Sequence, residues 1–226
     1  MFIFALMKKL VIFDLDGTLL NTIDDLGNAT NHALAVEGFP THPLEAYPMM
    51  VGNGVSRLLE RALPEEHRNK STLERIRSVF HDYYDEHLAD FTRPYPGVVE
   101  LLAALHERGV ALAVASNKYQ EAVTKLMGIF FPDVEWVAAF GHQEGVPSKP
   151  DPSIVFNILS AHPTPKAETL YVGDSGVDME TARRACIESV GVTWGFRPVS
   201  ELRDNHADHI IYNPVDILPI VANDFL

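Results

Sequence analysis

The sequence predicts an α/β fold built on a doubly wound parallel sheet, into which a helical domain is inserted. Short apolar runs recur along the chain and alternate with helical patterns, as in chains that cross repeatedly from a sheet to its flanking helices. The runs are continuously apolar, which is typical of strands buried on both faces of a parallel sheet. The first run ends at Phe13 and the second begins at Val110. This separation far exceeds one crossover helix and predicts the insertion.

The apolar runs define the expected strands in chain order. They are Leu10–Phe13, Val110–Ala115, Trp136–Phe140, Thr169–Val172, Glu188–Val192 and His209–Tyr212. A strand order of 3-2-1-4-5 would place the reversal of the sheet between the first and fourth strands. Ligands of doubly wound sheets bind beyond the carboxyl ends of the strands at such a reversal.

The segment between the first two strands is expected to be helical. Helical patterns cover Asp24–Ala35 and Val55–Leu63. A third helix is expected to begin near Pro64, with Leu73 and Ile76 on its apolar face.

This helical segment is expected to form a cap. Pro94 and Pro96 make the return linker semi-rigid, which suits a hinge. The expected domains are a helical cap at residues 20–92 and a Rossmann-like catalytic core at residues 1–19 and 93–226.

Helix ends are also recognisable in the core. Pro96 precedes a helix that is expected to stop at Gly109, a suitable residue just beyond a helix end. Asp151 and Pro152 are expected to open another helix as its N-cap and first residue. Cys186 lies at the end of an expected helix and is predicted to pack in the core.

Composition narrows the class of protein. The 226 residues carry a net charge of −13, which argues against nucleic acid as a partner because phosphate backbones need basic patches. The single cysteine fits a reducing compartment. The apolar N-terminal stretch is too short for a membrane span, and Lys8 and Lys9 follow it, the reverse of a signal peptide. We therefore expect a cytoplasmic monomer or homodimer without membrane partners. Met7 is a candidate natural start, which would leave residues 1–6 as an upstream extension.

Two carboxylates follow the first strand directly, at Asp14 and Asp16. Gly17 lets the chain leave extended geometry, and the hydroxyl of Thr18 is placed to hydrogen-bond into the turn. Paired carboxylates at a strand end suit a divalent cation, a nucleophile or an acid/base pair.

Three further clusters lie at strand or helix ends: Ser116-Asn117-Lys118, Ser148-Lys149-Pro150-Asp151-Pro152 and Gly173-Asp174-Ser175-Gly176-Val177-Asp178. The carboxylates of Asp14, Asp16 and Asp174 would repel one another, and Mg²⁺ would resolve that conflict. Lys149 adds a compact positive charge that suits phosphate, and Ser116 adds a neutral donor. Together these groups predict a phosphoryl-transfer site.

In this order, the four clusters resemble the motifs of the haloacid dehalogenase superfamily of phosphohydrolases, in the subclass with a small helical cap. Three further stretches are similar to the phosphoglycolate phosphatase group: Asn21-Thr22-Ile23-Asp24-Asp25-Leu26, Val51-Gly52-Asn53-Gly54-Val55 and Gly191-Val192-Thr193-Trp194-Gly195. The chain departs from that group at Ser116, where Thr is usual, and at Ser148, where Arg is common.

The resemblance implies catalytic roles. Asp14 would be the nucleophile that forms an aspartyl-phosphate. Asp16 would protonate the leaving oxygen and then activate water. Ser116 and Lys149 would hold the transferring phosphoryl group.

The resemblance also implies a metal site. Mg²⁺ would contact the Asp14 carboxylate, the Asp16 main-chain carbonyl and Asp174. Asp178 would lie behind these ligands and orient Lys149 or the waters on the metal.

The expected substrate is a small phosphorylated metabolite, with 2-phosphoglycolate the first candidate. Thr18, Asn117 and Lys118 in the core, and Gly54 and Arg57 in the cap, are the expected contacts. Arg57 would meet a second anionic group, although a plain helix-surface arginine fits equally well. A sugar-phosphate phosphatase, phosphomutase, pyrophosphatase or nucleotidase of the same superfamily remains open, as does a catalytically silent binding protein.

Overall fold

The computed structural model describes residues 7–223, so the expectation that residues 1–6 precede the natural start lies outside the described residues. Six parallel strands form the main sheet in the order β5-β4-β1-β6-β7-β8, which confirms the predicted order. Their bounds are β1 Leu10–Phe13, β4 Ala111–Tyr119, β5 Trp136–His142, β6 Thr169–Gly173, β7 Glu188–Val192 and β8 His209–Ile211.

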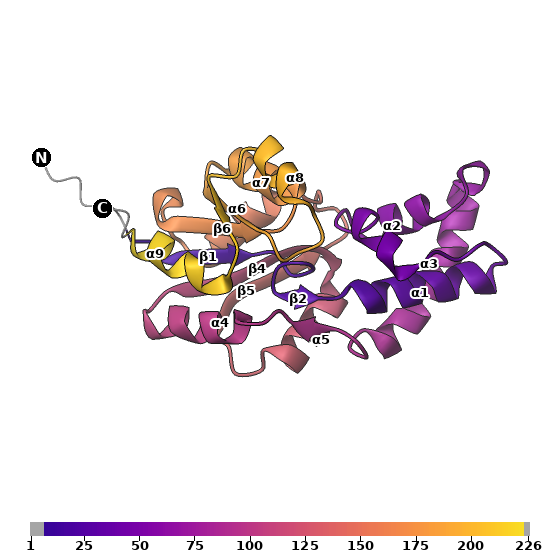
Figure 1. Cartoon of the computed structure of the whole chain (residues 1–226), viewed down its shortest axis with the longest axis horizontal. Coiled ribbons are helices and arrows are strands. Elements are labelled where there is room, and N and C mark those ends of the chain that lie inside the picture. The colour runs from indigo at the N-terminus through magenta and orange to yellow at the C-terminus, as the bar shows by residue number, and fades with distance from the viewer. Residues whose placement is uncertain (1–6, 224–226) are drawn as a thin grey trace, which may run out of the picture.

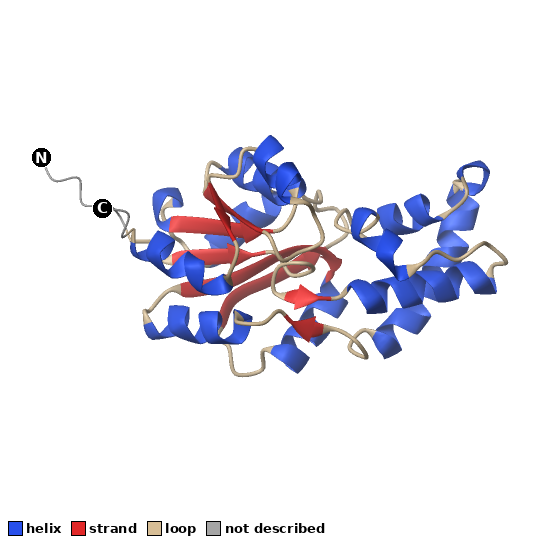
Figure 2. Ribbon diagram, in the orientation of Figure 1, coloured by secondary structure: helices blue, strands red, loops and turns tan. Residues whose placement is uncertain are grey.

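Helices cover both faces of this sheet (Figure 2). Val11 and Phe13 of β1 pack in the same cluster as α4, α5 and α9, whereas Leu10 and Ile12 pack in a second cluster with α6 and α7. Successive strand residues point to opposite faces, so this continuously apolar strand is buried on both sides. The helices of the core are α4 Val98–Glu107, α5 Gln120–Phe130, α6 Ser153–Ala161, α7 Gly176–Ala185, α8 Val199–Asp204 and α9 Ile217–Ala222, with short 3₁₀ turns η3 Lys166–Glu168 and η4 Pro214–Asp216.

A group of helices lies beyond the carboxyl ends of the strands (Figure 1). It consists of α1 Ile23–Val36, η1 Leu44–Met49, α2 Val55–Ala62, η2 Glu65–His67 and α3 Lys70–His87. The longest helix, α3, packs against both α1 and α2. Its buried apolar side chains Ile76, Phe80 and Tyr84 recur every four residues; Ile76 lies on the predicted apolar face, whereas Tyr84 is not among the residues predicted for it. We call these helices the cap; its boundaries at residues 20 and 92 stay a prediction.

The two connections of the cap run together as a short ribbon. Strand β2, Leu20–Asn21, pairs antiparallel with β3, Arg93–Pro94. Asp25, buried in α1, accepts hydrogen bonds from the Thr92 main-chain N–H at 2.8 Å, from the Thr92 hydroxyl at 2.7 Å and from the Phe91 N–H at 3.1 Å. A cap carboxylate therefore holds the returning linker.

Several element boundaries differ from the predictions. Helix α3 begins at Lys70 rather than near Pro64, because the Asn69 side chain caps it by accepting from the Thr72 N–H. Strand β4 continues through Tyr119, with a shift in register after Ala115.

Two further details of the core helices differ from the predictions. Helix α6 begins at Ser153, one residue late, and Asp151 accepts from the Ser153 N–H. Cys186 is not packed in the core. It is exposed and caps the end of α7 in a left-handed conformation, which turns its side chain away from the helix face. None of the helices within residues 7–223 combines the length and apolar content that a membrane crossing requires.

Candidate active site

The carboxyl end of β1 delivers Asp14 to the centre of the sheet edge. The ladder to β6 continues to this residue, since the Asp14 N–H donates to the Val172 carbonyl at 2.9 Å. Gly17 follows with a φ of +86°, and a Cβ there would lie 2.4 Å from a carboxylate oxygen of Asp174. Glycine is therefore required both by the backbone conformation and by the close approach of Asp174.

Lys149 is the buried cation of this edge. Its ammonium donates to Asp14 Oδ1 at 2.9 Å, to Asp178 Oδ1 at 2.8 Å and to the Ala115 carbonyl at 2.9 Å. Three acceptors match the three protons of an ammonium group. Lys149 thus fixes one oxygen of Asp14 and reaches it from the side of β4.

Asp178 holds the Lys149 ammonium in place and is itself held by several donors. Besides accepting from Lys149, its carboxylate accepts from the Ser175 N–H at 3.2 Å, from the Ser175 hydroxyl at 2.6 Å and from the Tyr171 hydroxyl at 3.3 Å. The bond from the Ser175 N–H is one half of a capping box at the start of α7, in which the Ser175 side chain accepts from the Asp178 N–H in return. Asp178 is completely buried by these partners and orients Lys149.

Asp14, Asp174 and Asp178 each offer a carboxylate oxygen, and these oxygens lie within 4.8 Å of one another. Burial, followed by the charge of Asp178, raises the pKa of Asp14 to about 7, although Lys149 acts in the opposite direction. Burial and the charges of Asp178 and Asp14 raise the pKa of Asp174 well above its ordinary value. A cation with a preference for oxygen ligands would offset this repulsion, so the donor set fits a divalent metal ion.

Asp16 lies apart from that cluster and faces the cap. Both of its carboxylate oxygens accept from the Lys118 ammonium, at 2.9 and 3.0 Å, and one accepts from the Thr22 hydroxyl at 2.7 Å. Burial lowers the pKa of Lys118, but the charge of Asp16 and the neighbouring Tyr84 outweigh that effect and raise it. Lys118 is therefore a charged, buried side chain beside Asp16.

Asn117 links three parts of the site. Its side-chain amide donates to the Gly52 carbonyl of the cap at 3.1 Å and to the Lys149 carbonyl at 3.2 Å, and its oxygen accepts from the Lys149 N–H at 2.9 Å. The neighbouring Ser116 hydroxyl accepts from the Lys118 N–H at 3.2 Å. These bonds hold the end of β4, the lysine loop and the cap loop together.

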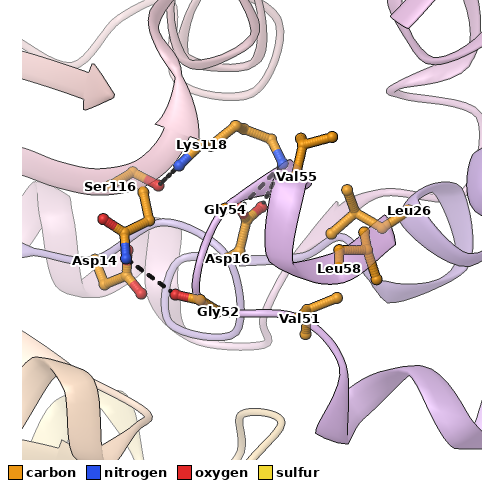
Figure 3. A pocket seen from close by; sticks show the side chains of 11 residues that line it. Asp14, Asp16, Leu26, Val51, Gly52, Gly54, Val55, Leu58, Ser116 and Lys118 are labelled. Atoms are coloured by element: carbon orange, nitrogen blue, oxygen red, sulfur yellow. Dashed lines mark hydrogen bonds and ion pairs between the residues drawn. The ribbon is translucent and has the colours of Figure 1, made fainter. Parts of the chain in front are cut away.

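A pocket with a volume of about 40 Å³ opens between the core and the cap. Figure 3 shows polar side chains of the core on one side and apolar side chains facing them. The lining residues are Asp14, Asp16, Leu26, Val51, Gly52, Gly54, Val55, Leu58, Ser116, Asn117 and Lys118.

Known proteins resemble this chain in sequence and in fold. Residues 11–192 match the family described as haloacid dehalogenase-like hydrolases. The chain belongs to this family.

Relatives within the haloacid dehalogenase-like hydrolases extend over nearly the whole chain. The phosphoglycolate phosphatase of Mannheimia succiniciproducens is 35% identical over 219 residues, covering 94% of this chain and 98% of the relative. That of Pseudomonas syringae pv. tomato is 35% identical over 208 residues, covering 86% and 74%. The crystal structure of a predicted phosphoglycolate phosphatase from Haemophilus somnus superposes with a TM-score of 0.86 at 30% identity, covering 94% of this chain and 97% of that one.

In this haloacid dehalogenase-like hydrolase, the structure brings most of the predicted site residues together. The pocket is bordered by Asp14, Asp16, Ser116, Asn117, Lys118 and Gly54. Around Asp14 lie Lys149, Asp174 and Asp178. The carboxylate cluster contains Asp178 and does not contain the Asp16 side chain. The catalytic and metal-binding roles of these residues stay predictions.

Two predicted substrate contacts are placed differently. The Arg57 side chain is 64% exposed and pairs with Glu60 one turn away at 2.5 Å, so it faces outward from α2 and does not line the pocket with Asp14. The Thr18 hydroxyl is buried, but within the described part of the chain it has no hydrogen-bond partner. The Thr18 carbonyl instead accepts from Trp194 Nε1 at 3.0 Å.

Sequence reasoning missed Thr22 and Tyr84. Thr22 lies at the start of α1, and its hydroxyl donates to Asp16. The sequence feature that could have predicted this contact is a hydroxyl residue a few positions after the two carboxylates. Tyr84 of α3 places its ring 5.0 Å from the Lys118 ammonium. No local pattern signals this contact, because it depends on how the cap lies on the core.

Proposed function

We propose that this protein is a Mg²⁺-dependent phosphomonoester hydrolase that acts through an aspartyl-phosphate on Asp14. The observation that carries the proposal is the setting of Asp14. One of its oxygens is fixed by the buried Lys149 ammonium, and it lies within a cluster of three carboxylates at the centre of the sheet edge. The relatives named phosphoglycolate phosphatase support a phosphatase activity.

The first half of the reaction transfers the phosphoryl group to the protein. An Asp14 oxygen attacks phosphorus and forms a new P–O bond, while the ester P–O bond breaks and Asp16 gives a proton to the leaving oxygen. The Ser116 hydroxyl donates to a phosphoryl oxygen, and the positive charge of Lys149 beside Asp14 offsets the negative charge of the phosphoryl group.

The second half regenerates the protein. Asp16, now ionised, takes a proton from water as the water oxygen attacks phosphorus. The bond between phosphorus and Asp14 breaks, which releases inorganic phosphate and a free Asp14 carboxylate. The contact with Lys118 holds the Asp16 side chain beside the pocket.

We assign Mg²⁺ to the carboxylate cluster. The Asp14 and Asp174 carboxylates and the Asp16 main-chain carbonyl would hold it, and Asp178 would support them through its bonds to Lys149 and Ser175. When bound, Mg²⁺ neutralises charge on the phosphoryl group and lets that dianion approach the Asp14 carboxylate.

The substrate class follows from the pocket. The pocket lies between the core motifs and apolar side chains of the cap, which favours an ester small enough to fit beneath the cap. Ser116 and Lys149 account for the phosphate, and Lys118 is a further buried cation that lines the pocket beside Asp16. A substrate carboxylate that binds Lys118 would also release Asp16 from its ion pair and allow it to carry a proton. We therefore propose a small phosphorylated acid such as 2-phosphoglycolate.

The test is phosphate release from a panel of about a hundred phosphate esters with Mg²⁺, with excess chelator, and after Mg²⁺ is restored. The Asp14→Asn variant is the matched control, because the amide keeps the shape of the side chain and loses its nucleophilicity. Hydrolysis that requires both Mg²⁺ and Asp14, and that is fastest for phosphoglycolate, supports the proposal. Turnover by Asp14→Asn within tenfold of the parent would refute the aspartyl-phosphate. A strong preference for sugar phosphates or nucleotides would overturn the substrate class alone.

A further inference from the structure

The segment between β7 and α8, residues 193–198, lies against the carboxylate cluster. Its Phe196 N–H donates to Asp174 Oδ2 at 2.7 Å. A Cβ at Gly195 would lie 2.3 Å from the Asp174 Cβ, so the main chain of this loop is pressed onto Asp174. Trp194 fixes the start of the loop through its bond to the Thr18 carbonyl.

The next residue, Arg197, reaches from this loop to the cap. Its side chain is only 9% exposed. The guanidinium donates to the Pro48 carbonyl at 2.5 Å and to the Val51 carbonyl at 2.7 Å. The rigid fork of an arginine suits two carbonyls that are presented side by side, whereas a lysine would offer a single ammonium.

The cap segment that Arg197 holds is a wall of the pocket. Val51, Gly52 and Gly54 line the pocket, and the Gly52 carbonyl is the acceptor for Asn117. The core thus holds this segment at two points, Asn117 on the side of the pocket and Arg197 behind it.

We propose that Arg197 is a positioning residue that holds the cap loop, residues 48–54, closed over the pocket and thereby favours compact substrates. Opening the cap would expose a buried guanidinium and two main-chain carbonyls to water, which replaces their hydrogen bonds. The net preference for closure is therefore modest and suits a cap that opens and closes during turnover. The effect on catalysis rests on the proposed phosphatase function; the effect on the loop does not.

The experiment compares the parent with Arg197→Gln, Arg197→Lys and Arg203→Gln, the last a control at an exposed arginine of α8. Hydrogen–deuterium exchange is followed in the metal-free protein for peptides that cover residues 48–54 and for peptides of β1 and β6. We expect exchange in the cap loop to be at least fivefold faster in Arg197→Gln, intermediate in Arg197→Lys and unchanged in Arg203→Gln, with the strands unaffected.

Kinetics supply the second readout. For phosphoglycolate, kcat/KM should fall at least tenfold in Arg197→Gln, mainly through KM. For p-nitrophenyl phosphate, whose aryl group the closed pocket does not favour, kcat/KM should be unchanged or higher. Equal losses on both substrates, or unchanged exchange in the cap loop, would overturn the proposal. If the parent hydrolyses neither substrate, the proposed function fails, and the exchange measurement still decides whether Arg197 holds the loop.

Discussion

Lys149 is the residue that the rest of the site depends on. It is the one cation bonded to the carboxylate cluster in the described chain, where it faces Asp14 and Asp178 directly. A single positive charge does not balance the three carboxylates of the cluster, and the raised pKa values of Asp14 and Asp174 reflect that excess of negative charge. The site is therefore under electrostatic strain without a divalent ion, and this has a measurable consequence.

The stability of the metal-free protein should decrease as pH rises. Asp14 has a pKa of about 7 when folded and the model-compound value of 3.8 when unfolded, so between these values the folded state binds more protons. The free energy of unfolding then falls with increasing pH across this window, and Asp174 adds to the fall. Urea unfolding at several pH values in chelator measures this slope. The Asp14→Asn variant should have a shallower slope, and an unchanged slope would contradict the assignment.

Asp174 and Asp178 should differ in their effect on metal binding. Asp174→Ala removes a proposed ligand and should weaken Mg²⁺ binding at least tenfold. Asp178→Ala removes an acceptor of Lys149 and the capping-box partner of Ser175 at the start of α7. It should therefore lower kcat and stability while changing Mg²⁺ affinity much less. Calorimetric titration with Mg²⁺, together with circular dichroism to verify folding, distinguishes the two. Equal losses of affinity would mean that Asp178 is itself a ligand.

At the scale of elements, the β2–β3 ribbon and Asp25 determine how the cap is attached. Asp25 is buried and accepts from both the main chain and the hydroxyl of Thr92. This contact joins the first helix of the cap to the linker that leaves it, so it fixes the angle at which both connections enter the core.

Asp25→Ala should destabilise the protein by about 3 kcal/mol, because the Phe91 and Thr92 N–H groups and the Thr92 hydroxyl would lose their buried acceptor. Asp24→Ala is the matched control, since Asp24 is the exposed neighbour on α1, and its effect should be about 0.5 kcal/mol or less. Urea unfolding measures both. A loss of similar size in the two variants would show that negative charge at the start of α1, and not the hydrogen bonds of Asp25 to the linker, accounts for the lost stability.

The elements of the core were predictable from the sequence because their signals are local. Apolar runs such as Leu10–Phe13 identify strands buried on both faces, and Gly109 ends α4 in the left-handed conformation that the sequence predicts. The motif residues could be assigned to one edge because parallel strands end together. The ion pairs among these residues could not be predicted. Which carboxylate Lys149 or Lys118 binds depends on side-chain directions, and the position of a residue at a strand end does not specify them.

The cap contacts were less predictable for a related reason. Arg57 and Arg197 are both arginines next to glycine-containing loops, yet Arg57 points outward and Arg197 is buried between core and cap. The difference depends on how the cap docks on the core, and these two parts are far apart in the sequence. The helical periodicity of the cap alone does not predict that docking. The start of α3 could have been found, because Asn69 is a good cap residue.

For the whole molecule, charge is unevenly distributed around the opening of the site. The chain has a net charge of −13, yet a hollow at the Lys149 loop is basic on balance. It is lined by Arg57, Arg61, Arg68 and Lys149, with Glu60, the partner of Arg57, as its one acidic residue within the described chain. An adjoining hollow shares Asn53 with this one and reaches Gly54 at the pocket. An anionic substrate would thus approach along a basic path on an acidic protein.

Salt should therefore weaken the capture of an anionic substrate. We expect kcat/KM for phosphoglycolate to fall several-fold between low and high ionic strength, with kcat nearly constant. The double variant Arg57→Gln/Arg68→Gln should start lower and depend less on salt. Arg75→Gln, which removes a partner of Glu37 elsewhere on the cap, should behave as the parent does. Identical salt dependence in all three proteins would rule out the basic path.

The position of β1 in the sheet has a consequence for synthesis on the ribosome. Leu10 is paired with Ala111 of β4 on one side and with Thr169 of β6 on the other. Strand β1 therefore leaves the ribosome long before either of the strands that it pairs with. The cap helices are complete before either partner exists, and their contacts are local, so we expect them to fold first. Asp174 follows the second of these partners. The nascent chain therefore acquires its acidic cluster, and with it any affinity for a divalent ion, only near the end of translation.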